Sequence, residues 1–218
     1  MSAPFLARAI REDYSGRIAL VSSFGAESAV LLHMVASVDP GVPVIFIDTE
    51  KLFGETLRYR DRLVQRLGLT DLRIVKPDPI AIAAADPDGA LWRRDPNLCC
   101  RLRKVQPLAR TLNGFDAWIN GRKRYQSGLR EAIPPVETSD GKIKINPLFD
   151  WTKQDLEDYF ETHGLERHPL IEDGYRSIGC MPCTDRVTPG EDDRAGRWRS
   201  QEKTECGIHL TGMMGDGI

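Results

Sequence analysis

Five cysteines are the residues in this 218-residue sequence whose type and spacing most clearly indicate chemistry. Cys99 and Cys100 are adjacent, Cys180 and Cys183 form a Cys-Met-Pro-Cys motif, and Cys206 stands apart near the C-terminus. Two cysteine pairs of this kind are difficult to explain by core packing, so we interpret the four as ligands of a metal centre. The fifth cysteine is then a free thiol.

A single zinc ion and an iron–sulfur cluster both bind four thiolates. Spacing alone leaves zinc a strong competitor. Neighbouring residues on a helix, however, point about 100° apart, because an α-helix has about 3.6 residues per turn. Such divergent ligands suit a larger cluster better than one small tetrahedral ion.

The free thiol could act as a nucleophile, because it lies in the motif Glu-Cys-Gly-Ile-His at 205–209. An unperturbed thiol is only a few per cent thiolate at neutral pH. Positive charge from Arg194, Arg197 or His209 that lowers its pKa by about 1.5 units, or roughly 2 kcal/mol, would leave about half of it ionised. The alternative is an incidental exposed thiol in a tail.

Basic residues are concentrated between Arg93 and Arg130, where ten lysines and arginines are opposed by only two aspartates. Such a patch favours a polyanionic small molecule, which arginine binds in a bidentate manner. Nucleic acid and a merely solvated face are the alternatives.

The composition excludes several classes of protein. The net charge is −2, with 41% hydrophobic and 28% charged residues, as is usual for a globular protein. No stretch approaches the roughly 20 apolar residues of a membrane span. The N-terminus lacks the apolar core of a signal peptide, so we expect a cytoplasmic protein with no membrane partner. The length predicts one domain with a tail, which we divide into residues 1–183 and a mobile C-terminal segment, 184–218.

The elements that must position these residues alternate between strand and helix. Strands are predicted at 18–22, 42–47, 72–75, 115–120 and 142–145, with helices at about 28–38 and 53–67. This alternation predicts an α/β fold, a mostly parallel twisted sheet with helices on both faces. Ligands of such sheets bind beyond the carboxyl ends of the strands. The turn at 23–28 follows the first strand and is a weak anion-site signal.

Two further helices have clear boundary signals. Asp95 is the predicted N-cap of a helix that carries the adjacent cysteines and ends at Gly114, with a kink at Pro107. Residues 152–155 form a predicted capping box with aspartate in place of glutamate, and Gly164 ends the helix that follows it.

Four segments occur in a specific order: Cys-Cys-Arg-Leu-Arg-Lys at 99–104, Ile-Gly-Cys-Met-Pro-Cys-Thr at 178–184, Arg-Ala-Gly-Arg-Trp at 194–198 and Glu-Cys-Gly-Ile-His-Leu at 205–210. With them, the chain from about residue 19 to 210 resembles the sulfonucleotide reductases. It is most similar to the cluster-containing adenylyl-sulfate (APS) reductases of assimilatory sulfate reduction. The resemblance implies an adenine-nucleotide α-hydrolase-like fold of the PP-loop type.

The resemblance also implies roles for individual residues. Cys99, Cys100, Cys180 and Cys183 would ligate one 4Fe–4S cluster, and Cys206 would be the catalytic nucleophile. The substrate-binding residues would be Ser23, Phe24, Gly25, Lys104, Arg130, Arg194, Arg197 and His209. Cys206 would take the sulfonate from APS and release AMP, and thioredoxin or a similar dithiol would then release sulfite.

Two departures from the family pattern are Glu50, where glycine is usual, and Asp185, where arginine is usual. The alternatives are a reductase of the 3′-phosphorylated substrate (PAPS), a PP-loop adenylating enzyme, and a zinc-stabilised module that binds nucleic acid. We expect no nucleic-acid partner, and the sequence leaves a homo-oligomeric state open.

Overall fold

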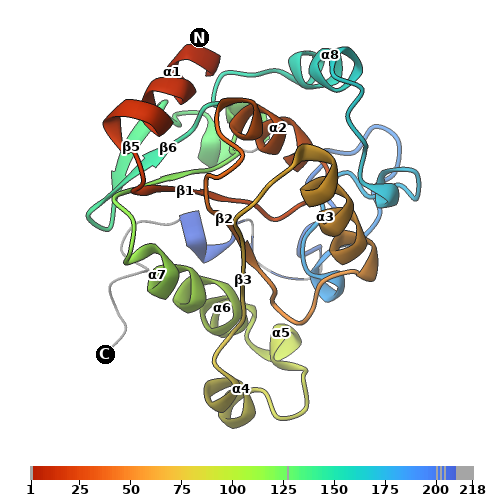
Figure 1. The fold of residues 1–218 in the computed structure, drawn as a ribbon. Helices are drawn as coiled ribbons and strands as arrows, with labels where there is room; N and C mark the ends of the chain where they lie inside the picture. The colour runs from red at the N-terminus through yellow and green to blue at the C-terminus, as the bar shows by residue number, and fades with distance from the viewer. Residues whose placement is uncertain (1, 127, 200, 202, 204, 210–218) are drawn as a thin grey trace.

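A six-stranded sheet runs through the centre of the computed structural model, which describes residues 2–126, 128–199, 201, 203 and 205–209 (Figure 1). Within these residues the strand order is β3-β2-β1-β4-β6-β5. The strands are β1 (Ile18–Val21), β2 (Val44–Ile47), β3 (Leu72–Val75), β4 (Ala117–Ile119), β5 (Val136–Ser139) and β6 (Lys142–Ile145). Neighbouring strands are parallel, except that β5 and β6 are antiparallel. The predicted α/β class is therefore confirmed.

Helices cover both faces of the sheet. Successive side chains of a strand point to opposite faces, so apolar side chains on both faces need a covering layer. In β1, Ile18 and Leu20 belong to a large apolar core, whereas Ala19 belongs to a smaller one. The large core is covered by α1 (Ser2–Arg8), α2 (Ser28–Val38), α3 (Gly54–Leu67) and α8 (Lys153–Thr162), and the smaller core by α7 (Gln106–Leu112). The two cores confirm the prediction of helices on both faces.

The predicted helix that carries the adjacent cysteines is divided into α6 (Pro96–Cys100), a π-helical turn (Arg101–Val105) and α7. The Asp95 carboxylate accepts a hydrogen bond from a backbone N–H of α6 at 2.8 Å, as expected of an N-cap. The π turn ends just before Gln106 and Pro107, and proline has no N–H to donate to a helical ladder. The irregularity predicted at Pro107 therefore takes the form of a π turn on its N-terminal side.

The sequence patterns did not indicate α1, α4 (Pro79–Ala85), α5 (Leu91–Arg94) or β5. The hairpin of β5 and β6 turns at Asp140 and Gly141, whose φ angles are 51° and 72°. An Asp-Gly dipeptide favours this two-residue turn, so it is the signal that identifies the hairpin. The capping box at the start of α8 is confirmed.

Shorter elements complete the described chain. They are a π-helical turn at Ala9–Asp13 and 3₁₀ helices at Arg124–Gln126, Gly128–Arg130, Pro169–Ile171, Met181–Cys183 and Gly207–His209.

The described part of the C-terminal segment 184–218 packs against the rest of the chain. Thr184 and Arg197 form an isolated β-bridge, and Trp198 is only 3% exposed. Ile208, in the 3₁₀ helix Gly207–His209, packs against the smaller apolar core, to which α7 contributes. Residues 200, 202, 204 and 210–218 lie outside the described residues, and the predicted mobility of this segment stays a prediction.

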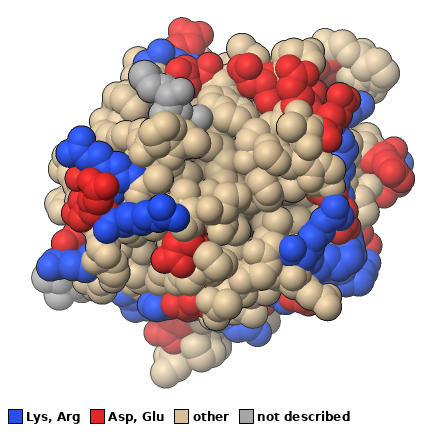
Figure 2. All heavy atoms as spheres, turned by 45° about the horizontal axis from the view of Figure 1, so that its top comes forward, with Lys and Arg blue, Asp and Glu red and all other residues tan. Residues whose placement is uncertain are grey.

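The face that carries α1, α2 and α8 shows both signs of charge, with lysine and arginine interspersed among acidic residues (Figure 2). Among the described helices, none combines the length and the apolar character that crossing a bilayer requires.

Candidate active site

A cavity of about 260 Å³ lies at the carboxyl ends of the parallel strands. β2 and β4 flank β1 on opposite sides, so the chain order reverses there, which is where open α/β sheets bind ligands. Ser23 after β1, Thr49 after β2 and Asn120 after β4 all line the cavity. The strand pattern predicts a ligand site at this edge of the sheet, and the cavity lies there.

The turn after β1 contributes two of its three predicted residues to the cavity, Ser23 and Gly25. Gly25 N–H donates to Ser28 Oγ at 2.9 Å, and a Cβ at Gly25 would lie 3.2 Å from the Ile178 carbonyl oxygen. Phe24 lies differently. Its φ of 49° turns the ring into the core, where it packs edge-on against Phe46, so its side chain does not line the cavity.

Glu27, at the end of this turn, is a site residue that the sequence patterns missed. Its carboxylate accepts hydrogen bonds from Lys123 Nζ at 2.6 Å, Tyr125 Oη at 2.6 Å and Gln126 Nε2 at 2.9 Å. Burial raises the pKa of Glu27, but Lys123 and the other donors outweigh burial and lower it overall. The network connects the turn after β1 to the basic segment after β4.

The cavity is rich in cations. Among the described lining residues, eight are lysine or arginine and four are acidic. The five predicted cationic or imidazole contacts all belong to this lining: Lys104, Arg130, Arg194, Arg197 and His209. An excess of buried positive charge favours an anionic ligand, because the four acidic residues of the described lining cannot neutralise all eight cations.

Cys206 also lines this cavity, and its side chain is 9% exposed. It packs beside Cys100 and Trp198. A hydrogen bond from the Cys100 thiol lowers the pKa of Cys206 and raises that of Cys100, and the Lys104 ammonium lowers the pKa of Cys206 further. The structure thus favours the thiolate at the residue predicted to be the nucleophile.

Lys104 provides positive charge close to these sulfurs. Burial alone would lower the pKa of its amine, but Cys180, Cys206 and Cys100 outweigh burial and raise it. Lys104 therefore stays protonated inside the cavity.

The four predicted ligand cysteines meet around a second, smaller cavity, which Cys99, Cys100, Cys180 and Cys183 line together. None forms a disulfide. Burial, together with Cys180, raises the pKa of Cys99 to about 11. In the part of the chain that the structure describes, no group of three or more cysteine, histidine or acidic side chains is placed to hold a metal ion.

Two polar side chains adjoin the cysteine cavity. Thr49 Oγ1 lies 3.1 Å from Cys180 Sγ. Arg103 lines the cavity, and its buried Nε has no hydrogen-bond partner among the described residues. Four cysteines that line one cavity, with an unpaired donor beside them, are the residue types that bind an iron–sulfur cluster.

Glu205, which also lines the main cavity, forms ion pairs with Arg130 at 2.6 Å and with Arg194 at 3.2 Å. His209 stacks on Trp118 with an angle of 6° between the rings. Burial, with the positive charge of Lys144 and its neighbours, lowers the pKa of His209 well below its ordinary value. The imidazole is therefore neutral, and its buried Nδ1 has no partner within the described chain.

The sequence of this chain is similar to the sequences of several known proteins. The model of the phosphoadenosine phosphosulfate reductase domain matches residues 17–186. An adenosine 5′-phosphosulfate reductase from Mesorhizobium japonicum is 53% identical over 206 residues, which cover 94% of this chain and 81% of that protein. One from Streptomyces coelicolor is 41% identical and covers 91% of this chain and 84% of that protein.

The fold of this chain is similar to that of several solved structures. The phosphoadenylyl-sulfate (PAPS) reductase from Candida auris, in a phosphate complex, has a TM-score of 0.71 at 28% identity and covers 86% of this chain and 91% of that one. An FMN adenylyltransferase from Candida glabrata, with a TM-score of 0.59 at 15% identity, covers 94% of this chain and 72% of that one and shares the fold. From the domain match and the identity to its relatives, the chain belongs to the phosphoadenosine phosphosulfate reductase domain family.

Proposed function

We propose that this protein reduces adenylyl sulfate to sulfite and AMP in sulfate assimilation. The observation that carries the proposal is the position of Cys206, whose thiol lines a cationic cavity at the carboxyl edge of the sheet and has a lowered pKa there. Relatives that share 38–53% of their residues with this chain are named adenosine 5′-phosphosulfate reductases. A PP-loop adenylating enzyme shares the fold but has no use for such a thiol.

In the first step the Cys206 thiolate attacks the sulfur of the phosphosulfate. A sulfur–sulfur bond forms, and the bond between sulfur and the bridging phosphate oxygen breaks. AMP leaves with that electron pair on its phosphate, and Cys206 becomes an S-sulfonate. Once Cys206 is a thiolate, no further proton needs to move, because the leaving phosphate is a stable anion.

The cations of the cavity stabilise the charge that moves in this step. Lys104 lies beside the thiol, and Arg130, Arg194 and Arg197 line the same space. Groups oriented in advance toward developing charge in a water-poor site are the largest source of stabilisation in many enzymes. Neutral His209, in the tautomer protonated at Nδ1, can donate one hydrogen bond to a sulfonate or phosphate oxygen.

The second step requires an external dithiol, for which we propose thioredoxin or a related protein. One thiolate of the dithiol attacks Cys206 Sγ, and sulfite leaves with the electron pair. The second thiol then attacks the mixed disulfide, which regenerates Cys206 and oxidises the dithiol to a disulfide. With four cysteines committed as ligands, the chain has no second thiol of its own for this step. A reducing compartment such as the cytoplasm would supply the dithiol.

We further propose that Cys99, Cys100, Cys180 and Cys183 bind one 4Fe–4S cluster. A bound cluster would join the α6 segment to the Cys-Met-Pro-Cys turn and contribute charge close to the nucleophile. A preparation with about four irons and four acid-labile sulfides per chain supports this assignment. One zinc per chain, with no sulfide, contradicts it.

The test of the reaction is mass spectrometry after incubation with adenylyl sulfate and no reductant. The peptide that contains Cys206 should gain about 80 Da, the mass of a sulfonate on a reactive thiolate. The variant Cys206→Ser should form no adduct and no sulfite while still binding AMP. Full activity in Cys206→Ser, or the lack of any adduct in the wild type, refutes the proposal.

The choice between the two sulfonucleotides is tested by kcat/KM. We propose adenylyl sulfate, because the relatives with the higher identities carry that name. A strong preference for the 3′-phosphorylated substrate would overturn this part alone.

A further inference from the structure

Glu205, the residue before the nucleophile, has no part in the steps above, yet it is one of the few acidic side chains in the cavity. Its carboxylate accepts hydrogen bonds from Arg130 Nε at 2.7 Å and from Arg130 Nη2 at 2.9 Å. Arg194 Nη2 lies 3.2 Å from the same carboxylate. The side chains of Glu205 and Arg130 are 7% and 8% exposed, so this is a buried ion pair.

The location of this ion pair is unusual, because its two arginines line the space proposed for the phosphosulfate. Buried guanidinium groups need a counter-charge. In the structure without ligand, Glu205 supplies it from the segment that carries Cys206. The Arg130 and Arg194 side chains thus bind a carboxylate where the substrate would bring its own oxyanions.

The same segment has a second attachment on the other side of Cys206. Ile208 packs against the smaller apolar core, and His209 stacks on Trp118. Cys206 therefore lies between a charged attachment at Glu205 and an apolar attachment at 208–209. Removal of the charged attachment would leave the apolar attachment at 208–209 and the packing of Cys206 against Cys100 and Trp198, among the contacts of the described residues.

We propose that Glu205 is the positioning residue of the nucleophile: it docks Cys206 in the cavity through Arg130 and Arg194, in competition with the substrate's oxyanions. This inference rests on the proposed reaction. The charge of Glu205 then has opposite effects on two steps. It places the thiolate for attack, and it opposes nucleotide binding because it occupies the arginines.

The test compares Glu205→Gln with Glu191→Gln, a control in the same segment whose carboxylate binds Arg199 outside the cavity. At saturating adenylyl sulfate, the single-turnover rate of adduct formation on Cys206 should fall at least about tenfold in Glu205→Gln, as expected when a hydrogen-bonded charge is lost. AMP should bind as tightly as to the wild type, or more tightly. Glu191→Gln should change neither quantity, and Glu205→Asp should restore part of the rate.

A second measurement needs no substrate. The maximal, pH-independent rate at which iodoacetamide labels Cys206, followed on its peptide by mass spectrometry, should increase in Glu205→Gln, because the thiol is only 9% exposed when docked. Unchanged labelling and an unchanged adduct rate overturn the proposal. So does a parallel loss of AMP affinity and thermal stability, which would indicate a merely structural role. If the wild type forms no adduct, the proposed reaction fails, whereas labelling still decides whether Glu205 docks Cys206.

Discussion

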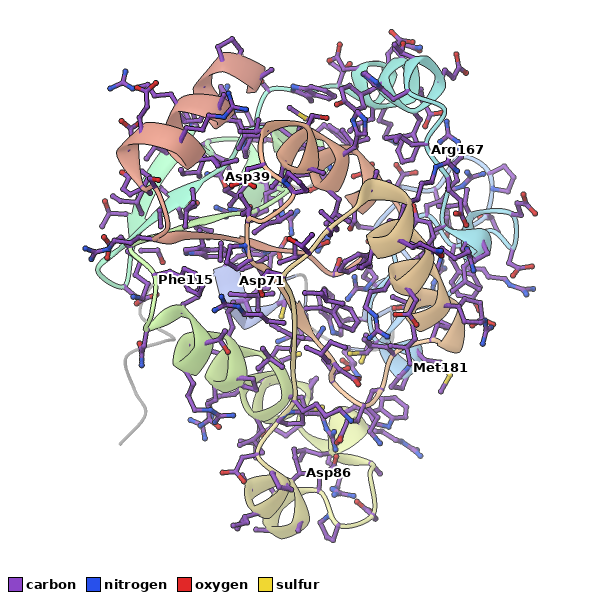
Figure 3. All side chains as sticks on the ribbon, in the orientation of Figure 1. Asp39, Asp71, Asp86, Phe115, Arg167 and Met181 are labelled. Carbon is purple, nitrogen blue, oxygen red and sulfur yellow. The ribbon has the colours of Figure 1, made fainter. Side chains whose placement is uncertain are left out.

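The buried ion pair between Asp86 and Arg103 allows a quantitative prediction about the cysteine cavity. Asp86 lies in the loop between α4 and α5, at the end of the molecule away from α1 (Figure 3). Its Oδ2 accepts from Arg103 Nη2 at 2.7 Å, and its Oδ1 accepts from the Leu91 N–H at 2.7 Å. The Asp86 side chain is fully buried, and Arg103 is 5% exposed. Arg103 in turn donates to the Thr49 carbonyl oxygen at 2.9 Å, close to the Thr49 contact with Cys180.

Asp86→Ala removes the buried carboxylate that pairs with Arg103 and leaves the guanidinium only the longer, 3.5 Å contact with the half-exposed Glu50 among the described residues. Such a change costs about 3–5 kcal/mol of the free energy of unfolding. At about 2–4 °C per kcal/mol for a chain of this length, Tm should fall by roughly 10 °C. Asp86→Asn keeps the shape and one acceptor, so we expect a smaller loss of about 1.5–3 kcal/mol.

The pH dependence of this pair has a definite sign. Burial raises the pKa of Asp86, but the hydrogen bonds from Arg103 and Leu91 outweigh burial and lower it. A carboxyl group whose pKa is lower in the folded state stabilises the protein above its unfolded pKa, about 3.9, and loses that contribution as the pH falls through the folded value. The difference between wild type and Asp86→Asn should therefore be constant near neutral pH and shrink below about pH 4.

The assay is thermal and urea unfolding followed by circular dichroism, on preparations matched in iron content. Asp88→Asn is the matched control, since Asp88 lies in the same loop and pairs with Arg94 at the surface, where both side chains are about half-exposed. It should change stability little, because exposed ion pairs contribute little. Equal destabilisation by Asp86→Ala and Asp88→Asn would refute the reasoning.

Three further predictions concern other parts of the chain. Burial, together with Arg122, lowers the pKa of Lys144 to about 7. Between about pH 7 and 10.4 the unfolded state therefore binds more protons than the folded state, and the free energy of unfolding of the wild type should rise with pH. Urea unfolding across this range should show that Lys144→Met loses this rise. A Cβ at Gly179 would overlap the Arg197 guanidinium, so Gly179→Ala should raise KM for the sulfonucleotide in steady-state assays, and an unchanged KM would contradict the proposed contact. Thr152→Ala removes the capping box of α8 and should lower the free energy of unfolding by about 1 kcal/mol, measured by urea unfolding, with no change in adduct formation.

The predictions that the sequence supported best depend on local physical chemistry. Runs of apolar residues place strands, and an aspartate one position before a proline caps α6. The possible roles of the two cysteine pairs and of the separate Cys206 can also be predicted from the sequence alone, because their chemistry depends on residue type and spacing. A local signal was also available for the hairpin of β5 and β6, in its Asp-Gly turn, although the strand pattern alone did not reveal it.

The placement of site residues across the fold is a property of the tertiary structure. The contacts of Cys206 with Cys100 and of Glu205 with Arg130 join segments far apart in the chain. They form because the order of the parallel strands brings the loops that follow them to one edge of the sheet. The backbone likewise decides that Phe24, with a φ of 49°, packs into the core while its neighbours line the cavity. Residue types thus determined which chemistry was available, whereas sheet topology and burial decided which groups meet and which thiol is favoured as thiolate.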